Sequence, residues 1–190
     1  MCAYFGPAKI ARMADQSSTE RKANIWAPWR IAYIRALDDS DDGCFLCRYR
    51  DNPAGDREQL VLWRGQRCFV VMNRFPYTGG HLLVSPTAHV ADLGAVDDAT
   101  MVELLSLVRD VQAILRHALK CEGFNVGMNF GRCAGAGLPG HLHVHVVPRW
   151  SGDTNFMTVL GDVRVIPESL ESLYDGLQQA AGELALPNLP

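Results

Sequence analysis

The longest amphipathic segment of the chain runs from Asp97 or Asp98 to about Lys120. Apolar residues recur there at three- and four-residue spacing, which predicts a helix that buries one face. This stripe consists of Leu104, Leu107, Val108, Val111, Ile114, Leu115 and Leu119. An aspartate at the start can cap the helix, because its carboxylate accepts from first-turn amides. His117 lies off the stripe, and we expect it at the surface.

Shorter apolar runs on both sides of this helix predict β-strands. Residues 59–73 have the pattern of a hairpin with its turn at 64–66, and residues 81–86 form the next candidate strand. Two further strands are expected at 123–131 and at 140–147, where Pro148 should end the ladder because it has no N–H to donate. A last helix is expected from Pro167 to about Leu184. The pattern predicts an α+β fold, with an antiparallel sheet of about five strands and the long helix packed on it.

The N-terminal part of the chain differs in pattern from the rest. Residues 1–24 show no periodicity and predict a flexible extension, and residues 25–190 predict a single domain. Residues 25–34 are aromatic and predict a short helix. That helix either packs on the core or brings Trp29 or Arg30 to a ligand site.

Three of the six histidines alternate with apolar residues in the last candidate strand, at His141, His143 and His145. Alternate residues of a strand project to one face, so the three imidazoles are expected side by side. An imidazole can act as a nucleophile, a proton carrier or a metal ligand. The row therefore indicates a chemical function.

A glycine-rich segment, residues 131–140, directly precedes the histidines. Glycine allows backbone amides to approach an anion closely, as in phosphate-binding loops. A phosphate held beside a row of imidazoles suggests attack of a histidine on phosphorus.

Cys44 and Cys47 have the spacing of half a tetrahedral zinc site, and the spacing alone equally allows two buried thiols. Cys68, Cys121 and Cys133 are expected to be small core residues. The chain has no secretory signal, so a disulfide framework is not expected, and we predict a cytoplasmic protein.

Composition narrows the class of partner. The 190-residue chain has a net charge of −3, which argues against general nucleic-acid binding. No stretch is apolar enough to span a bilayer, so no membrane partner is expected. A small phosphorylated ligand held by loop amides remains compatible with this charge.

The histidine segment with its glycine loop resembles the histidine-triad superfamily of nucleotide hydrolases and transferases. The superfamily motif is His-φ-His-φ-His-φ-φ, where φ is apolar, and residues 141–147 fit it completely. Residues 71–86, which contain Asn73 and Gly80-His81, resemble the other half of the family pattern. The chain is most similar to bacterial diadenosine polyphosphate phosphorylases and hydrolases, through residues 26–30, 125–129, 148–150, 155–156 and 165–167.

The resemblance implies a catalytic role for several histidines. His143 would attack the α-phosphorus and form a covalent nucleotidyl-histidine, which water or inorganic phosphate then cleaves. His145 would hydrogen-bond a non-bridging phosphate oxygen, with His81 supporting it from the neighbouring strand. His141, the first histidine of the triad, completes the catalytic set.

The resemblance also implies which residues bind the nucleotide. Asn73 would hold the ribose hydroxyls, and Val71 and Leu83 would flank the adenine. The phosphates would be bound by Asn129 and by the amides of Gly135, Ala136 and Gly137. Many family members have Ser or Gln just before the triad, whereas this chain has Leu138-Pro139-Gly140. Arg132 and Arg149 either steer the polyphosphate or are ordinary solvated side chains.

The resemblance also implies which two residues complete the zinc site begun by Cys44 and Cys47. Related proteins combine C-x-x-C with a histidine after the Ser-Pro strand and with the first triad histidine. Here these residues form the set Cys44, Cys47, His89 and His141, which implies a structural zinc and no organic cofactor. The family also implies a homodimer formed through the long helix and an edge strand.

The function expected is cleavage of a dinucleoside polyphosphate such as diadenosine tetraphosphate. Two alternatives use the same residues: a nucleoside phosphoramidate hydrolase, and a non-catalytic nucleotide-binding sensor or adaptor. Metal storage by the histidine row fits less well, because the segment is apolar and ordered rather than a histidine-rich tract.

Overall fold

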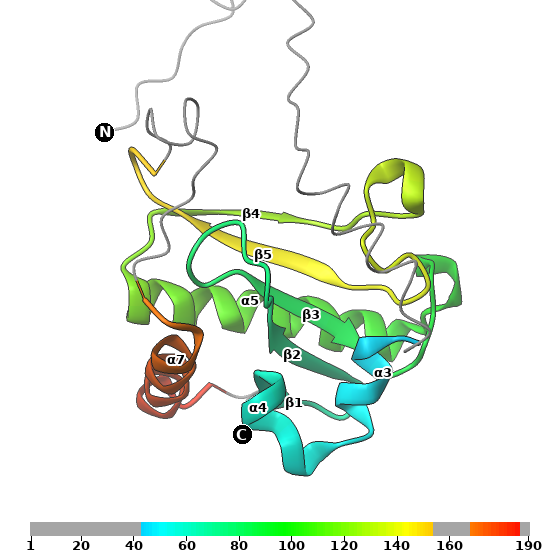
Figure 1. Ribbon diagram of the computed structural model, residues 1–190, viewed down its shortest axis with the longest axis horizontal. Coiled ribbons are helices and arrows are strands. Elements are labelled where there is room, and N and C mark those ends of the chain that lie inside the picture. The colour runs from blue at the N-terminus through cyan, green and yellow to red at the C-terminus, as the bar shows by residue number, and fades with distance from the viewer. Residues whose placement is uncertain (1–42, 154–167, 187–190) are drawn as a thin grey trace, which may run out of the picture. The chain divides into compact units, whose positions relative to one another are not determined.

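The sheet has five strands in the order β1-β2-β3-β5-β4, and all neighbouring strands are antiparallel (Figure 1). The computed structural model describes residues 43–153 and 168–186. The predicted extension 1–24, the segment 25–34 and residues 154–167 lie outside the described residues. The strands are β1 (Val61–Arg64), β2 (Cys68–Met72), β3 (Leu82–Pro86), β4 (Gly123–Gly127) and β5 (Val144–Arg149).

Helices accompany this sheet on both faces. The α-helices are α3 (Phe45–Arg50), α4 (Asp56–Gln59), α5 (Asp98–Leu119) and α7 (Leu170–Leu184), with short 3-10 turns at Pro53–Gly55, Leu93–Ala95 and Arg132–Ala134. The α+β class predicted from the sequence is confirmed. None of the helices described is both long and apolar enough to cross a membrane.

The long helix α5 forms as predicted. The Asp97 carboxylate accepts from the Thr100 amide at 2.9 Å, and Lys120 ends the helix in a left-handed conformation. The predicted apolar stripe is buried along the sheet, with Leu119 partly buried at its end. His117 points away from this core and pairs with Glu183 of α7 at 2.7 Å.

Alternating residues of the strands separate two apolar clusters. Val70, Val84 and Val146 belong to the cluster that packs against α5 and α7. Phe69 and Leu83 point to the opposite face, where α3 covers them with its own apolar residues. The face that α5 leaves uncovered is therefore the one on which β5 presents His145.

Some expectations about local structure were wrong. Strand β4 ends at Gly127 rather than at residue 131, and α7 begins at Leu170, where the Ser169 side chain accepts from the Ser172 amide. Pro148 lies inside β5 rather than ending it, because β3 pairs with β5 only as far as Val146. Beyond that point no described strand pairs with β5 on the side of β3, so the missing N–H of Pro148 costs no ladder bond there. Cys133 is exposed, whereas Cys68 and Cys121 are buried as expected.

Candidate active site and metal centre

A row of residues crosses four strands on the face opposite α5. Val71 of β2 faces Leu83 of β3, Leu83 faces His145 of β5, and His145 faces Gly127 of β4. Directly paired residues of an antiparallel sheet share a face and lie close together. The two apolar residues expected beside a base and the last triad histidine thus lie in one row on the same face of the sheet, where Val71 and Leu83 are buried.

The triad histidines are not three residues of one paired strand, as the alternation predicted. Strand β5 begins at Val144, so His141 and His143 lie in the extended segment before it. The Leu142 amide donates to the Val90 carbonyl at 2.6 Å, and the Leu142 carbonyl accepts from Ser85 Oγ at 2.8 Å. These two bonds fix the segment beside the end of β3 without a ladder.

His81 and His145 form a hydrogen-bonded pair, with 3.0 Å between His81 Nε2 and His145 Nδ1. The protonation of the pair follows from its neighbours. The Tyr77 amide donates to His81 Nδ1 at 3.2 Å. When neutral, His81 must then carry its proton on Nε2 and donate it to His145 Nδ1. The neutral His145 ring therefore carries its own proton on Nε2.

Asn73 supports the same arrangement. Its Oδ1 accepts from the Phe75 amide at 2.9 Å, which identifies the other side of the carboxamide as the amino group. That Nδ2 lies 3.2 Å from His81 Nδ1 and donates to it. Asn73, expected at the ribose, is thus engaged with the histidine pair, and the carboxamide keeps one further donor and lone pair for a ligand.

His143 is 7% exposed, and its Nδ1 lies 2.8 Å from the His141 carbonyl oxygen. A carbonyl can only accept, so Nδ1 carries the proton and Nε2 keeps a lone pair. Burial lowers the pKa of His143 below the ordinary range of an imidazole, which favours the neutral ring. A neutral imidazole with a fixed tautomer and a free lone pair on Nε2 is suited to nucleophilic attack.

Gly80 sets the position of His81 next to it. Its φ is +84°, and a Cβ there would lie 2.6 Å from Leu119 Cδ1. Both the left-handed backbone and the close approach of α5 require glycine.

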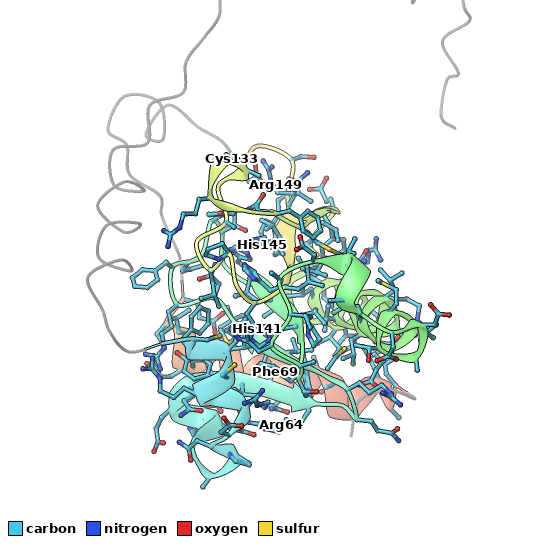
Figure 2. All side chains as sticks on the ribbon, turned by 90° about the vertical axis from the view of Figure 1, so that its right-hand side faces the viewer. Arg64, Phe69, Cys133, His141, His145 and Arg149 are labelled. Carbon is cyan, nitrogen blue, oxygen red and sulfur yellow. The ribbon has the colours of Figure 1, made fainter. Side chains whose placement is uncertain are left out.

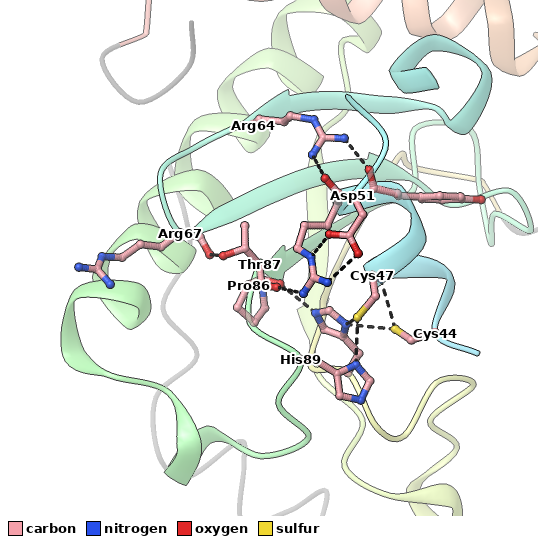
Figure 3. Close-up of polar contacts among 11 residues, drawn as sticks. Cys44, Cys47, Asp51, Arg64, Arg67, Pro86, Thr87 and His89 are labelled. Carbon is pink, nitrogen blue, oxygen red and sulfur yellow. Dashed lines mark hydrogen bonds and ion pairs between the residues drawn. The ribbon is translucent and has the colours of Figure 1, made fainter. Parts of the chain in front are cut away.

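The Cys₂His₂ set expected from the sequence comes together in space (Figure 3). Cys44 Sγ lies 3.1 Å from His141 Nδ1, and Cys47 Sγ lies 3.2 Å from His89 Nδ1. All four candidate ligand atoms lie within 4.8 Å of one another. A tetrahedral zinc site places sulfur and nitrogen ligands about 3.6 Å apart, so the set fits a zinc ion.

The surroundings of the cluster agree with this fit. His141 Nε2 lies 2.9 Å from the Pro86 carbonyl oxygen and must donate to it, which leaves Nδ1 to face the thiols. Burial raises the pKa of the Cys44 thiol, a cost that a bound cation would offset. The four residues come from the start of α3, the segment after β3 and the segment before β5.

The glycine loop follows β4, with Cys133 near its tip at the top of Figure 2 and with His145 and then His141 below. Gly131 and Gly135 take positive φ values of 74° and 84°. The Gly135 amide donates to the Arg132 carbonyl at 2.9 Å, and the Ala136 amide donates to the Gly131 carbonyl at 3.2 Å. A phosphate could engage these two amides only by displacing those bonds.

The two arginines near the site lie in different surroundings. Arg149 forms an ion pair with Asp153 at 2.5 Å and donates to Asn125 Oδ1 at 2.7 Å. These bonds hold the Arg149 side chain to the turn after β5 and to the neighbouring strand β4. Arg132 is exposed at the start of the 3-10 turn in the glycine loop.

Sequence reasoning missed Tyr77. Its ring centroid lies 4.6 Å from that of His81 and 6.0 Å from that of His145. The signal available in the sequence was its place in the same loop as Asn73 and His81.

Fold and site together define a class of protein in which β5 of an antiparallel sheet and the segment before it carry three spaced histidines beside a glycine loop. Residues 55–152 match the HIT domain family. The AP-4-A phosphorylase of Mycobacterium tuberculosis (strain H37Rv) is 37% identical over 151 residues, which are 77% of this chain and 77% of that protein. The chain belongs to the HIT, or histidine triad, family.

Two further comparisons bear on activity and metal. The asymmetrical bis(5'-nucleosyl)-tetraphosphatase of Schizosaccharomyces pombe is 30% identical over 65% of this chain and 68% of its own length. A zinc-bound histidine triad family protein of Mycobacterium smegmatis has a TM-score of 0.62 and 26% identity, over 75% of this chain and 96% of that structure. Family and relatives together support a nucleotide hydrolase or transferase that processes dinucleoside polyphosphates.

Proposed function

We propose that the protein cleaves a dinucleoside polyphosphate, with diadenosine tetraphosphate as the simplest substrate, through a covalent intermediate on His143. The observation that carries the proposal is the buried His143 ring, whose Nδ1 is bound to a carbonyl so that Nε2 is the nucleophilic atom. The family membership and the two named relatives supply the substrate class.

In the first step, His143 Nε2 attacks the α-phosphorus, and the anhydride bond to the remaining polyphosphate breaks. A phosphoramidate bond forms between Nε2 and phosphorus, and the leaving nucleotide departs with the bonding electrons. Water or inorganic phosphate then attacks the same phosphorus and returns Nε2 to its free state. Splitting one substitution into two makes each step easier.

The other site residues act around this phosphorus. His145 donates from Nε2 to a non-bridging phosphate oxygen, where negative charge builds up in the transition state. His81 holds His145 in the tautomer that allows this donation. His141 acts through its carbonyl, which orients the nucleophile.

The remaining assignments concern binding. Val71 and Leu83 flank the base, and Asn73 reaches the ribose with the donor that His81 does not use. The phosphates lie against Asn129 and the loop at Gly135, Ala136 and Gly137, after the loop bonds rearrange.

We also propose that Cys44, Cys47, His89 and His141 hold a structural zinc ion. Four protein ligands leave no open position, so the metal would cross-link three segments rather than take part in the reaction. A homodimer, as is usual in the family, completes the proposal.

The test is intact-protein mass spectrometry after brief incubation with diadenosine tetraphosphate, with product chromatography. A transient adenylyl adduct on the wild type and none on His143→Ala supports the covalent route. A protein that binds AMP but never forms an adduct or product would instead be a nucleotide sensor.

A further inference from the structure

Tyr77 lies against the His81–His145 pair from the loop between β2 and β3. Its ring is inclined by 35° to His81 and by 22° to His145, at centroid separations of 4.6 Å and 6.0 Å. The Tyr77 side chain is 36% exposed, so it covers the imidazoles while still reaching solvent. Stacked aromatic rings restrict each other's rotation, and Tyr77 therefore limits how both histidines can turn.

The backbone of the same residue acts on the same pair. The Tyr77 amide donates to His81 Nδ1, and this bond assigns the proton of His81 to Nε2. Ring and amide belong to one residue, so the placement of Tyr77 couples the orientation of the imidazoles to their tautomers.

We propose that Tyr77 is a positioning residue of the reaction, which holds His81 and His145 so that the Nε2–H of His145 faces the phosphate. The inference rests on the proposed function, because the donor is useful only if a phosphate oxygen receives its hydrogen bond. If the ring is removed, His145 gains rotational freedom and presents an acceptor or a C–H for part of the time. Partners that orient a catalytic ring in this way are worth about 10–100-fold in activity by analogy with metal-bound histidines.

Three variants separate the ring from the rest of the loop. Tyr77→Phe keeps the ring and the amide, so it should retain wild-type turnover. Tyr77→Ala keeps the amide and loses the ring, so its kcat should fall about 10–100-fold while KM changes little. Phe75→Ala removes a 65% exposed aromatic two residues away in the same loop and should leave kcat unchanged.

A sulfur substitution reports on the donor itself. Sulfur accepts hydrogen bonds more weakly than oxygen, so the α-phosphorothioate of diadenosine tetraphosphate with sulfur at the position facing His145 should react more slowly with the wild type. In Tyr77→Ala the ratio between the oxygen and sulfur substrates should shrink, because the donor is no longer aligned. A residue that only stabilises the fold would lower both rates and leave their ratio unchanged.

Long-range ¹H–¹⁵N spectra of the imidazoles give a readout that does not depend on turnover. Wild type and Tyr77→Phe should show His145 as the Nε2–H tautomer, and Tyr77→Ala should show a mixture. Wild-type kcat and an unchanged tautomer in Tyr77→Ala would overturn the inference. If the wild type itself cleaves no dinucleotide, the proposed function fails, and the tautomer experiment still decides whether Tyr77 orients the pair.

Discussion

His141 belongs to both the candidate metal centre and the candidate active site. Its ring faces Cys44 and Cys47, and its carbonyl accepts a hydrogen bond from Nδ1 of His143. A displacement of the ring therefore moves the acceptor that fixes the nucleophile. Side chain and main chain of one residue thus connect the candidate metal centre to the proposed nucleophile.

The histidine pair predicts a graded loss of activity. His145→Ala removes the donor and should lower kcat about 100–1000-fold, the loss seen when one oxyanion donor is deleted. His81→Ala keeps the His145 donor and removes only the ring that orients it, so kcat should fall less than in His145→Ala. Steady-state kinetics with diadenosine tetraphosphate measures both.

His117→Ala is the control for this series, because His117 pairs with Glu183 on α7 and lies outside the site. Its kcat should match that of the wild type. Equal kcat values for His145→Ala and wild type would contradict the role of the pair.

Gly80 predicts a loss of stability. Gly80→Ala combines a left-handed backbone with a Cβ placed 2.6 Å from Leu119 Cδ1. The free energy of unfolding should fall by about 2 kcal/mol or more, from strain and overpacking together. Urea denaturation measures it.

The neighbouring Gly79→Ala is a matched control, because a Cβ at Gly79 would meet nothing within 4 Å. It should change the free energy of unfolding much less than Gly80→Ala. Equal losses in the two variants would show that the close approach to α5 is unimportant.

Among the elements, α3 would depend most on the proposed metal centre. The helix has six residues and begins at Phe45, with Cys44 as its N-cap, and its Leu46 and Tyr49 belong to the apolar cluster that includes Val71 and Leu83. So short a helix is not stable by itself. The cysteine ligands at its first turn would hold it over the proposed base pocket.

Metal removal should therefore loosen this helix. Cys47→Ser, or treatment of the wild type with a chelator, should release about one zinc ion per chain, lower the melting temperature and weaken AMP binding. Elemental analysis, thermal denaturation and AMP titration measure the three effects.

Cys133→Ser is the matched control, because Cys133 is exposed in the glycine loop and is not among the candidate ligands. It should keep its zinc and its melting temperature. Full zinc content in Cys47→Ser would contradict the assignment of the metal centre.

Periodicity was sufficient for the elements that bury a regular face. The stripe of α5 and the hairpin of β1 and β2 could be predicted because burial alone selects their apolar positions. The segment 141–143 has the same alternation without pairing, since its hydrogen bonds come from Val90 and Ser85. Local sequence does not reveal such distant partners.

The candidate site residues that belong to a sequence motif, namely the histidines and the cysteine pair, could be predicted from the sequence. The contacts of Tyr77 were not, because an aromatic residue in a turn has no fixed function. The engagement of the Gly135 and Ala136 amides within their loop depends on backbone angles that glycine leaves open.

At the scale of the whole molecule, β4 leaves one side of the sheet unpaired within the described part of the chain. Its residues Asn125, Val126 and Gly127 are exposed, with Val126 at 47%. An exposed strand edge is a template for pairing with another chain. This edge is the surface through which the proposed homodimer would form.

Light scattering on the full chain should give twice the 21.0 kDa of one chain. Val126→Lys places a charge on the edge and should shift the mass to that of one chain, whereas Gln179→Lys on the exposed face of α7 should not. A wild-type monomer would contradict the proposed assembly.

In the proposed reaction, His143 carries the nucleotide as a covalent intermediate. The most direct measurement is the intact mass of the protein within the first turnovers of diadenosine tetraphosphate, with and without inorganic phosphate. A transient adenylyl adduct should form on the wild type and none on His143→Ala. ADP among the products only when phosphate is present would identify a phosphorylase, and AMP with ATP in both conditions would identify a hydrolase. Turnover by His143→Ala at the wild-type rate, or an adduct on another residue, would contradict the account.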